Sequence, residues 1–442
     1  SSGVRVCKRW VQIEGATFLV ESTRYPDLDA LLATLPWSEQ PDAALALPHP
    51  PSALAQATET ERGRQTHRTP PVLLASLGWS AGAPVRPFIL ARAGASSPIA
   101  GRERGVVIDY TTVASQPDMT FKGDTTYYVT GLVSLSGSTT IEGGTVVKFP
   151  RFDVVPSAGI AVLGPTDCQA TPYRPAVFTA KDDDSVGEII AGSTGNPSPT
   201  IYYGGGLQFA QDAALANMRM VYAQFALKVN EGVELELRHA QLVKCRYPFQ
   251  ALAGSTVNVR NALICRPLQG WYTTDNEILI QGHAFTLTGE HLTVDYCERF
   301  ADDWGDPQFS QVSLTNSLVT DLWLWGDISP TLIATEQAPW QGTFQTVGAG
   351  THYLAPGSNY RDVGMYAISP SLLAELRDMT TFPPIDLGSP EDPIYGPILQ
   401  DSVLPLRPRQ EDDALDLGYH YWPLDWLASG LQVSGATLKL LN

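Results

Sequence analysis

The chain has 442 residues, of which 43% are hydrophobic and 17% are charged, so it can bury a substantial core and is not disordered throughout. Its 46 acidic residues outnumber its 29 lysines and arginines, and the net charge of −17 disfavours nucleic acid and anionic lipid as partners. No apolar run reaches the roughly 20 residues that span a bilayer, and the first residues contain neither Met nor a signal segment. We therefore expect a soluble, processed chain without a membrane span.

The first hundred residues contain three different kinds of sequence. Residues 4–13 and 17–20 predict two short strands joined by a turn. Leucines between residues 28 and 35 follow the i, i+3, i+4, i+7 spacing of a short amphipathic helix. From 36 to 98, prolines interrupt every regular period, so this arm has no core of its own and needs another surface to become ordered. Residues 1–105 are thus predicted to form a strand, a short helix and an extended arm.

A repeat interval indicates the architecture of the middle of the chain. From about residue 106, short β-rich runs alternate with Gly or Ser, and no segment has the length of a helix. Leu215, Leu237 and Val259 each begin the pattern aliphatic, any residue, Asn or His, small or apolar, at intervals of 22 residues. Looser copies begin at Leu287 and Leu314, at intervals of 28 and 27. This period predicts an all-β solenoid of stacked coils over residues 106–345, with parallel sheets and inward aliphatic side chains.

The third position of the repeat carries Asn217, His239, Asn261 and Asn316. We interpret these residues as a stacked polar ladder at one corner of the coil, where each side chain bonds to backbone groups of a turn. The alternative for His239 is a general base.

Four further segments are similar to the right-handed parallel β-helix proteins, and in particular to a group of uncharacterised secreted bacterial members. They comprise residues 140–149, 175–183, 347–354 and the Asp-x-Gly-aromatic segment at 416–421. The resemblance implies a β-helix closed by an irregular C-terminal cap over residues 346–442, and a secreted or cell-surface location. Within this cap, Ser369 and Pro370 are expected to begin a short helix. The fold hosts lyases, hydrolases, adhesins and structural proteins, so it leaves the chemistry open.

Clustered carboxylates are the candidate catalytic signal. Glu298, Asp302 and Asp303 lie beside Trp304, and two carboxylates next to a sugar-stacking ring are what glycoside hydrolysis requires. This acidic group and residues 182–184 could equally bind calcium or be solvated turns, and calcium is the one cofactor that the sequence allows for. Of the sequence motifs of polygalacturonases, only Asp302-Asp303 is matched, which counts against that activity. Trp271, Tyr272 and Trp304 are the predicted carbohydrate-binding aromatics.

The five cysteines show no zinc-ligand spacing, so no metal site is predicted from them. Cys7 and Cys168 form a disulfide in one reading and remain thiols in the other. Cys245, Cys265 and Cys297 follow their repeat anchors at similar distances and are expected to be small buried residues of neighbouring coils.

The two ends of a β-helix expose unpaired strand edges, which must be covered or will recruit further strands. The flanking regions either cap these ends or reach into the next molecule head to tail. The predicted assembly residues are Val4, Val6, Trp10, Val11 and Ile13. The sequence therefore favours a secreted structural protein, either a self-assembling fibre subunit or a cell-surface adhesin. The alternatives are a polysaccharide lyase or glycoside hydrolase acting in a groove along the β-helix, and a carbohydrate-binding module that lacks the acids.

Overall fold

The computed structural model describes residues 6–13, 16–23, 110–197, 202–265, 278–304, 310–339, 341–387 and 414–427. The chain divides into two compact units, residues 1–70 and 71–442, which are treated separately. In the first unit, β1 (Val6–Ile13) and β2 (Ala16–Thr23) form an antiparallel hairpin, which confirms the two predicted strands. The predicted helix at 28–35 and the proline-rich arm lie outside the described residues, as does Val4.

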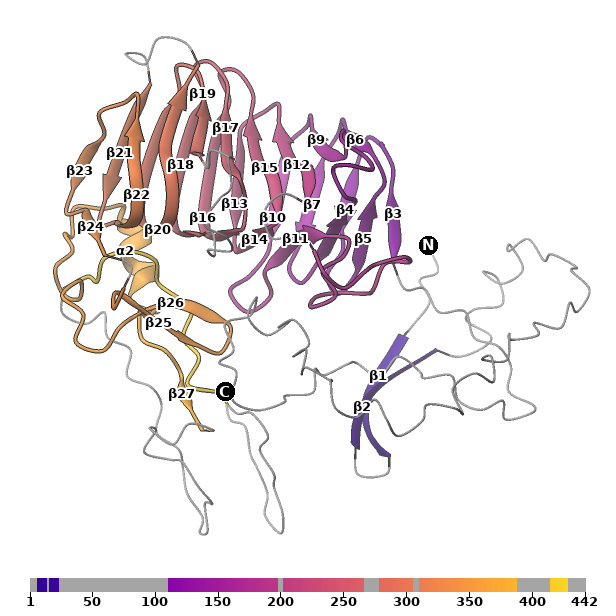
Figure 1. Cartoon of the computed structure of the whole chain (residues 1–442). Helices are drawn as coiled ribbons and strands as arrows, with labels where there is room; N and C mark the ends of the chain where they lie inside the picture. Colours follow the sequence, from indigo (N-terminus) through magenta and orange to yellow (C-terminus); the bar gives the residue numbers. More distant parts are fainter. Residues whose placement is uncertain are drawn as a thin grey trace, which may run out of the picture. The chain divides into compact units, whose positions relative to one another are not determined.

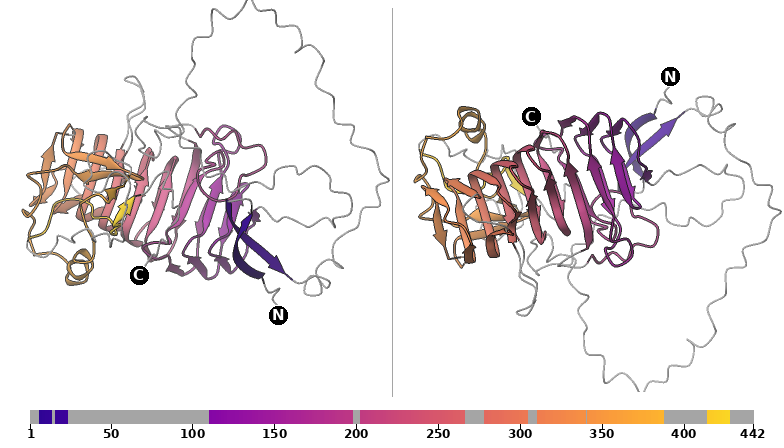
Figure 2. Two further views of the ribbon diagram at one scale, coloured as in Figure 1. Left: turned by 90° about the horizontal axis from the view of Figure 1, so that it is seen from below. Right: turned by 90° about the horizontal axis from the view of Figure 1, so that it is seen from above.

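The second unit is a right-handed parallel β-helix, as predicted (Figure 1). Each coil contributes strands to three faces, which we number in the order in which the chain visits them. Figure 2 shows the coils stacked in sequence order. Among the described residues, no helix is long and apolar enough to cross a bilayer.

The three faces and the strands that continue from one face to the next have the following bounds. Face 1 contains β4 (Met119–Phe121), β7 (Thr139–Glu142), β10 (Thr166–Gln169), β13 (Ala213–Ala216), β21 (Gln311–Thr315) and β23 (Thr331–Ile333). Face 2 contains β3 (Thr111–Val113), β5 (Thr126–Val129), β8 (Val146–Phe149), β11 (Ala176–Ala180), β14 (Met218–Val221) and β24 (Glu336–Ala338). Face 3 contains β6 (Leu132–Leu135), β9 (Gly159–Val162), β12 (Tyr203–Phe209), β15 (Ala223–Val229), β17 (Tyr247–Ala251) and β19 (Ile278–Gly282). Four long strands turn a corner, namely β16 (Glu234–Val243), β18 (Thr256–Cys265), β20 (Thr286–Asp303) and β22 (Leu318–Gly326).

Aliphatic and aromatic side chains fill the interior in stacks along the axis. On face 1, Leu215 pairs with Leu237 and Leu237 pairs with Val259, and all three are buried. Parallel pairing places equivalent residues of successive coils about 4.8 Å apart, so each stack buries apolar area continuously. The 22-residue interval therefore is one turn of the coil, as predicted.

The corner between faces 1 and 2 is made by one residue of left-handed backbone in each coil. Asn217, His239, Asn261, His291 and Asn316 have φ angles between 50° and 55°. Asn is among the few residues other than glycine that tolerate this conformation, because its short polar side chain can bond locally. This confirms the predicted polar ladder and adds His291, which the sequence pattern missed.

The later repeat intervals were wrong by a few residues. Val259 pairs with Gly289, and Gly289 pairs with Leu314, so these intervals are 30 and 25 rather than 28 and 27. Leu287 instead pairs with Val257. The reason is steric, since a Cβ on Gly289 would come within 2.5 Å of Leu292 and 2.7 Å of Leu314. A glycine thus occupies the aliphatic position and hides the repeat.

An irregular C-terminal region covers face 2, as predicted. It contains the hairpin of β25 (Phe344–Val347) and β26 (Gly350–Leu354), the helix α2 (Pro370–Leu376), and the short pair β27 (Ile385–Asp386) and β28 (Trp426–Leu427). The α2 helix begins at Pro370 as expected, although the side chain of Ser369 makes no capping bond. The segment 414–421, which holds the predicted closing motif, packs Tyr419 and Tyr421 on Leu263.

Candidate functional site

The predicted acidic pair is not arranged as two carboxylates facing one cleft. Asp302 and Asp303 are consecutive residues of β20, and Glu298 lies half-buried earlier in the same strand. The Asp303 side chain is buried and accepts hydrogen bonds from the backbone N of Ala284, at 3.3 Å, and from Ser310. Asp302 pairs with Arg299 at 3.0 Å. Asp303 therefore holds a turn of the coil.

The second acidic cluster, Asp182 to Asp184, is also used by its own loop. Asp182 accepts from the Oγ1 of Thr194 at 2.8 Å, and Asp184 from the Oγ of Ser193 at 2.8 Å. Beneath this loop, the buried Nζ of Lys148 donates to the carbonyl oxygens of Asp183 and Glu188, at 2.8 and 2.7 Å. Burial lowers the pKa of Lys148. Within the described ranges, no group of three or more His, Cys, Asp or Glu side chains is placed to hold a metal ion.

The cysteines behave as buried thiols where they are described. Cys168 is a free thiol that donates to the carbonyl of Ala216 at 3.4 Å, so the predicted bond to Cys7 is not formed in this structure. Cys245, Cys265 and Cys297 line one small cavity of about 20 Å³, as their repeat positions predicted. Burial raises the pKa of Cys265 to about 12, which makes its thiolate scarce at neutral pH.

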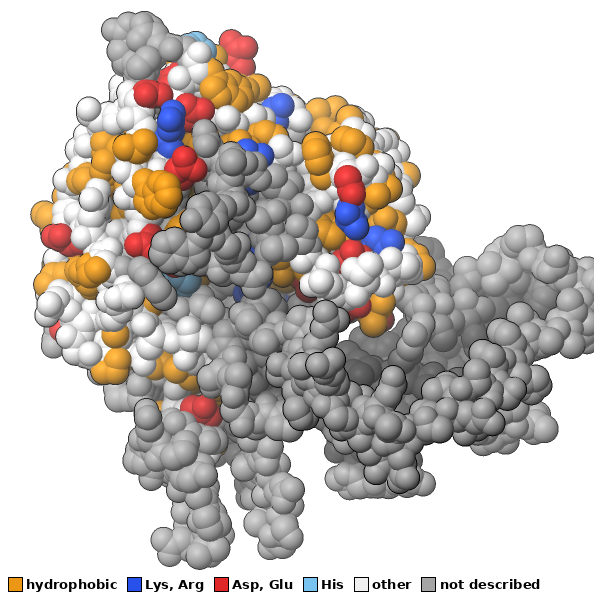
Figure 3. Space-filling view, viewed as in Figure 1, with side chains coloured by type: hydrophobic (Ala, Val, Ile, Leu, Met, Phe, Trp, Pro, Cys, Tyr) orange, Lys and Arg blue, Asp and Glu red, His pale blue; other side chains and the backbone are white. Residues whose placement is uncertain are grey.

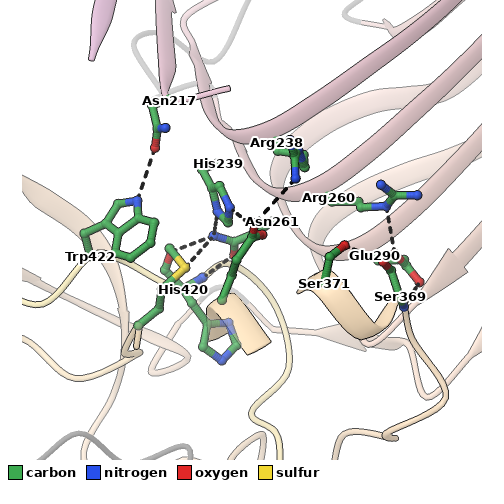
Figure 4. A network of polar contacts seen from close by, with 12 residues as sticks. Asn217, Arg238, His239, Arg260, Asn261, Glu290, Ser369, Ser371, His420 and Trp422 are labelled. Atoms are coloured by element: carbon green, nitrogen blue, oxygen red, sulfur yellow. Dashed lines mark hydrogen bonds and ion pairs between the residues drawn. The ribbon is translucent and has the colours of Figure 1, made fainter. Parts of the chain in front are cut away.

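His239 belongs to a structural network rather than to a reaction site (Figure 4). Its Nε2 lies 2.9 Å from Glu375, and its Nδ1 accepts from the Nδ2 of Asn261 at 3.1 Å. Asn261 also bonds the backbone of His420 on both sides, through its Oδ1 at 2.7 Å and its Nδ2 at 2.9 Å. Burial lowers the pKa of His239. Because both ring nitrogens are occupied, His239 joins the ladder to the cap and is not free to act as a base.

A hollow on the outside of face 3 is the most open feature without a structural use. It has a volume of about 330 Å³, within the range of small-ligand pockets. We call it the face 3 slot. Its floor is the glycine run of β12, Gly204 to Gly206, together with Ala158 and Gly159 of the preceding coil. In Figure 1 its strands β9, β12 and β15 follow one another along the stack.

The slot exists because two successive coils lack a side chain where their neighbours have one. Leu132 pairs with Gly159, the backbone of Gly159 lies against that of Gly205, and Gly205 pairs with Phe225. Three strand spacings of about 4.8 Å therefore separate Leu132 from Phe225. Beyond Phe225, the ring of Tyr247 stacks on the phenylalanine ring at a centroid distance of 4.9 Å and an angle of 17°. One end of this aromatic stack thus borders the slot.

Polar side chains surround this apolar floor. Gln208, Lys228 and Gln250 occupy one outward column of face 3 on three successive coils, and all three line the slot. Gln224 lines it from β15, and Phe152 and Pro156 line it from the β8–β9 connection. An apolar base with a few convergent polar groups is the usual composition of a ligand site.

The sequence-predicted aromatics lie elsewhere. Trp271 and Tyr272 fall outside the described residues, and Trp304 is 53% exposed after β20 but does not line the slot. Sequence reasoning missed Phe225 and Tyr247, although they are 22 residues apart. Extending the repeat one coil towards the N-terminus would have found Gly205 in the same column.

The surface charges complete the description. On the face shown in Figure 3, acidic and basic side chains of the described residues are intermixed and form no continuous basic patch. Comparisons with family models, with curated proteins and with solved structures gave no match for this chain.

Proposed function

We propose that this protein binds saccharide chains in the face 3 slot and acts as an extracellular adhesin. The observation that supports the proposal is the gap at Gly159 and Gly205, which leaves the aromatic stack of Phe225 and Tyr247 bordering an open hollow. A sugar ring seated there would extend the stack by one member.

The lining suits a saccharide in two respects. The apolar face of a pyranose ring packs on an aromatic ring, and the floor of glycines leaves room for that contact. Its hydroxyl groups need both donors and acceptors, which the side-chain amides of Gln208, Gln224 and Gln250 supply together. Gln224 and Gln250 make no other hydrogen bond in the part of the chain that the structure describes.

Binding fits the slot better than cleavage does. Hydrolysis requires a proton donor and a nucleophile or base, most often two carboxylic acids. No Asp or Glu is among the described residues that line the slot. The acids predicted for catalysis, Asp302 and Asp303, take part in an ion pair and in a buried turn.

A substitution at Gly205 tests the proposal. A Cβ at this position meets only Ala158 and Gly159, at 3.4 and 3.8 Å, and its backbone is not left-handed, so side chains fit without strain. Gly205→Phe should fill the slot beside Phe225, whereas Gly205→Ala should leave most of it open. We expect affinity electrophoresis through a panel of embedded polysaccharides to show retardation of the wild type and of Gly205→Ala, and none of Gly205→Phe.

Equal thermal stability of the three proteins is the control for folding. Retardation of Gly205→Phe equal to that of the wild type would exclude the slot as the binding site. Wild-type mobility unchanged by every polysaccharide would contradict the proposed function.

The extracellular location and the fibre are separate proposals. The β1 strand pairs with β2 within its own hairpin, which leaves one edge of β1 for another strand. If β1 mediates assembly, negative-stain microscopy should show filaments of the full chain and none after deletion of residues 1–20.

A further inference from the structure

We infer that the face 3 slot selects acidic saccharides and that Lys228 recognises their negative charge. The inference rests on the proposed function and names the ligand class. It starts from the charge of the lining, because Lys228 is the single charged side chain among the described residues that form the slot. The slot thus carries a positive charge on a chain whose net charge is −17.

The ammonium group of Lys228 has no competing partner. Its neighbours in the outward column, Gln208 and Gln250, are neutral. Within the described ranges, Lys228 makes neither an ion pair nor a side-chain hydrogen bond. By contrast, Arg151, Arg174 and Arg260 each pair with a carboxylate. Lys228 is therefore available to an incoming anion.

The position of Lys228 favours an anion on a ring that is already bound. Lys228 lies three residues after Phe225 on β15, so the aromatic contact and the charge come from one strand. A ring seated against Phe225 would hold a carboxylate or sulfate substituent within reach of the flexible lysine side chain. Charge-assisted hydrogen bonds are about twice as strong as neutral ones, and the flanking amides add neutral donors without a competing negative charge.

Matched ligands test the inference. Calorimetry would compare oligouronates and sulfated oligosaccharides with their carboxyl-reduced and desulfated counterparts, at low salt and at high salt. We expect the acidic member of at least one pair to bind the wild type about tenfold more tightly, corresponding to about 1.4 kcal/mol, and high salt to reduce this preference. The pair that shows it identifies the anion as carboxylate or sulfate.

Variants of Lys228 locate the effect. Lys228→Met should remove the preference for the acidic ligand and leave the affinity for the neutral one unchanged, whereas Lys228→Arg should retain the preference. Lys122→Met makes the same change in net charge at an exposed residue outside the slot and should have no effect. Equal binding of acidic and neutral ligands to the wild type, or a preference that survives in Lys228→Met, would refute the role of Lys228 and leave the proposed function standing. Absence of binding to any ligand would overturn both.

Discussion

Replacing Asn261 by alanine should loosen the C-terminal segment 414–421 from the coils. Asn261 is fully buried and has a φ of 50°. It accepts from the backbone N of His420 and donates to its carbonyl oxygen, at 2.7 and 2.9 Å. The substitution leaves both backbone groups of a buried residue without these partners and puts alanine in a left-handed conformation that it disfavours.

The magnitude follows from these two effects. A buried polar group left unpaired costs about 1–3 kcal/mol, and the left-handed conformation costs a non-glycine residue about 1–2 kcal/mol. Asn261→Ala should therefore lower the free energy of unfolding by about 3–6 kcal/mol. Asn261→Gly loses the same bonds but tolerates the backbone, so it should be less destabilising than Asn261→Ala by about 1 kcal/mol.

Urea denaturation and limited proteolysis would measure the effect. Asn258→Ala is the matched control, because Asn258 lies in the same strand with an exposed side-chain bond to Glu234, and its loss should cost at most about 0.5 kcal/mol. If Asn261→Ala differs from this control by less than about 1 kcal/mol, the ladder does not hold the C-terminal segment. The same conclusion would follow if the two variants are digested at equal rates.

Three further predictions concern buried polar groups. Burial lowers the pKa of His291 well below its usual value, so its contribution to stability is complete above about pH 6.5 and is lost as the pH falls, by up to about 1.4 kcal/mol per pH unit. Urea midpoints between pH 8 and 5 would measure this decline. Lys148→Met should lower stability by about 2–4 kcal/mol and speed proteolysis in residues 181–197, because two buried carbonyls lose a charged donor. Asp303→Asn should cost about 1–3 kcal/mol, whereas Asp302→Asn should cost at most about 0.5 kcal/mol, and neither should change saccharide binding.

Each of these has a contradicting result. Urea midpoints that do not fall between pH 6.5 and 5 would mean that His291 is not held neutral. Unchanged proteolysis of Lys148→Met would show that Lys148 does not support the loop. Loss of binding in Asp302→Asn, with stability unchanged, would return that carboxylate to the candidate site.

Local sequence predicted the coil and its corner because both depend on residues close together in the chain. An aliphatic residue two positions before an Asn or His recurs at 22 residues, which is one turn of the stack. Left-handed backbone selects Asn at the corner for a steric reason that operates within a single residue. The same logic failed at Gly289, where a glycine stands for the aliphatic side chain because Leu292 and Leu314 fill its space.

The sequence by itself thus determined the β-helix, its left-handed corner ladder and its closing segment. Only the tertiary structure decided that Asn261 meets His420, 159 residues later, and that Gly205 meets Phe225 beside a hollow. The physical reason is register: side chains share a column only when the connections between their strands have the right lengths, and these lengths vary from coil to coil. The slot is made of side chains that are missing, and an absence becomes a binding surface only when neighbouring coils supply its walls.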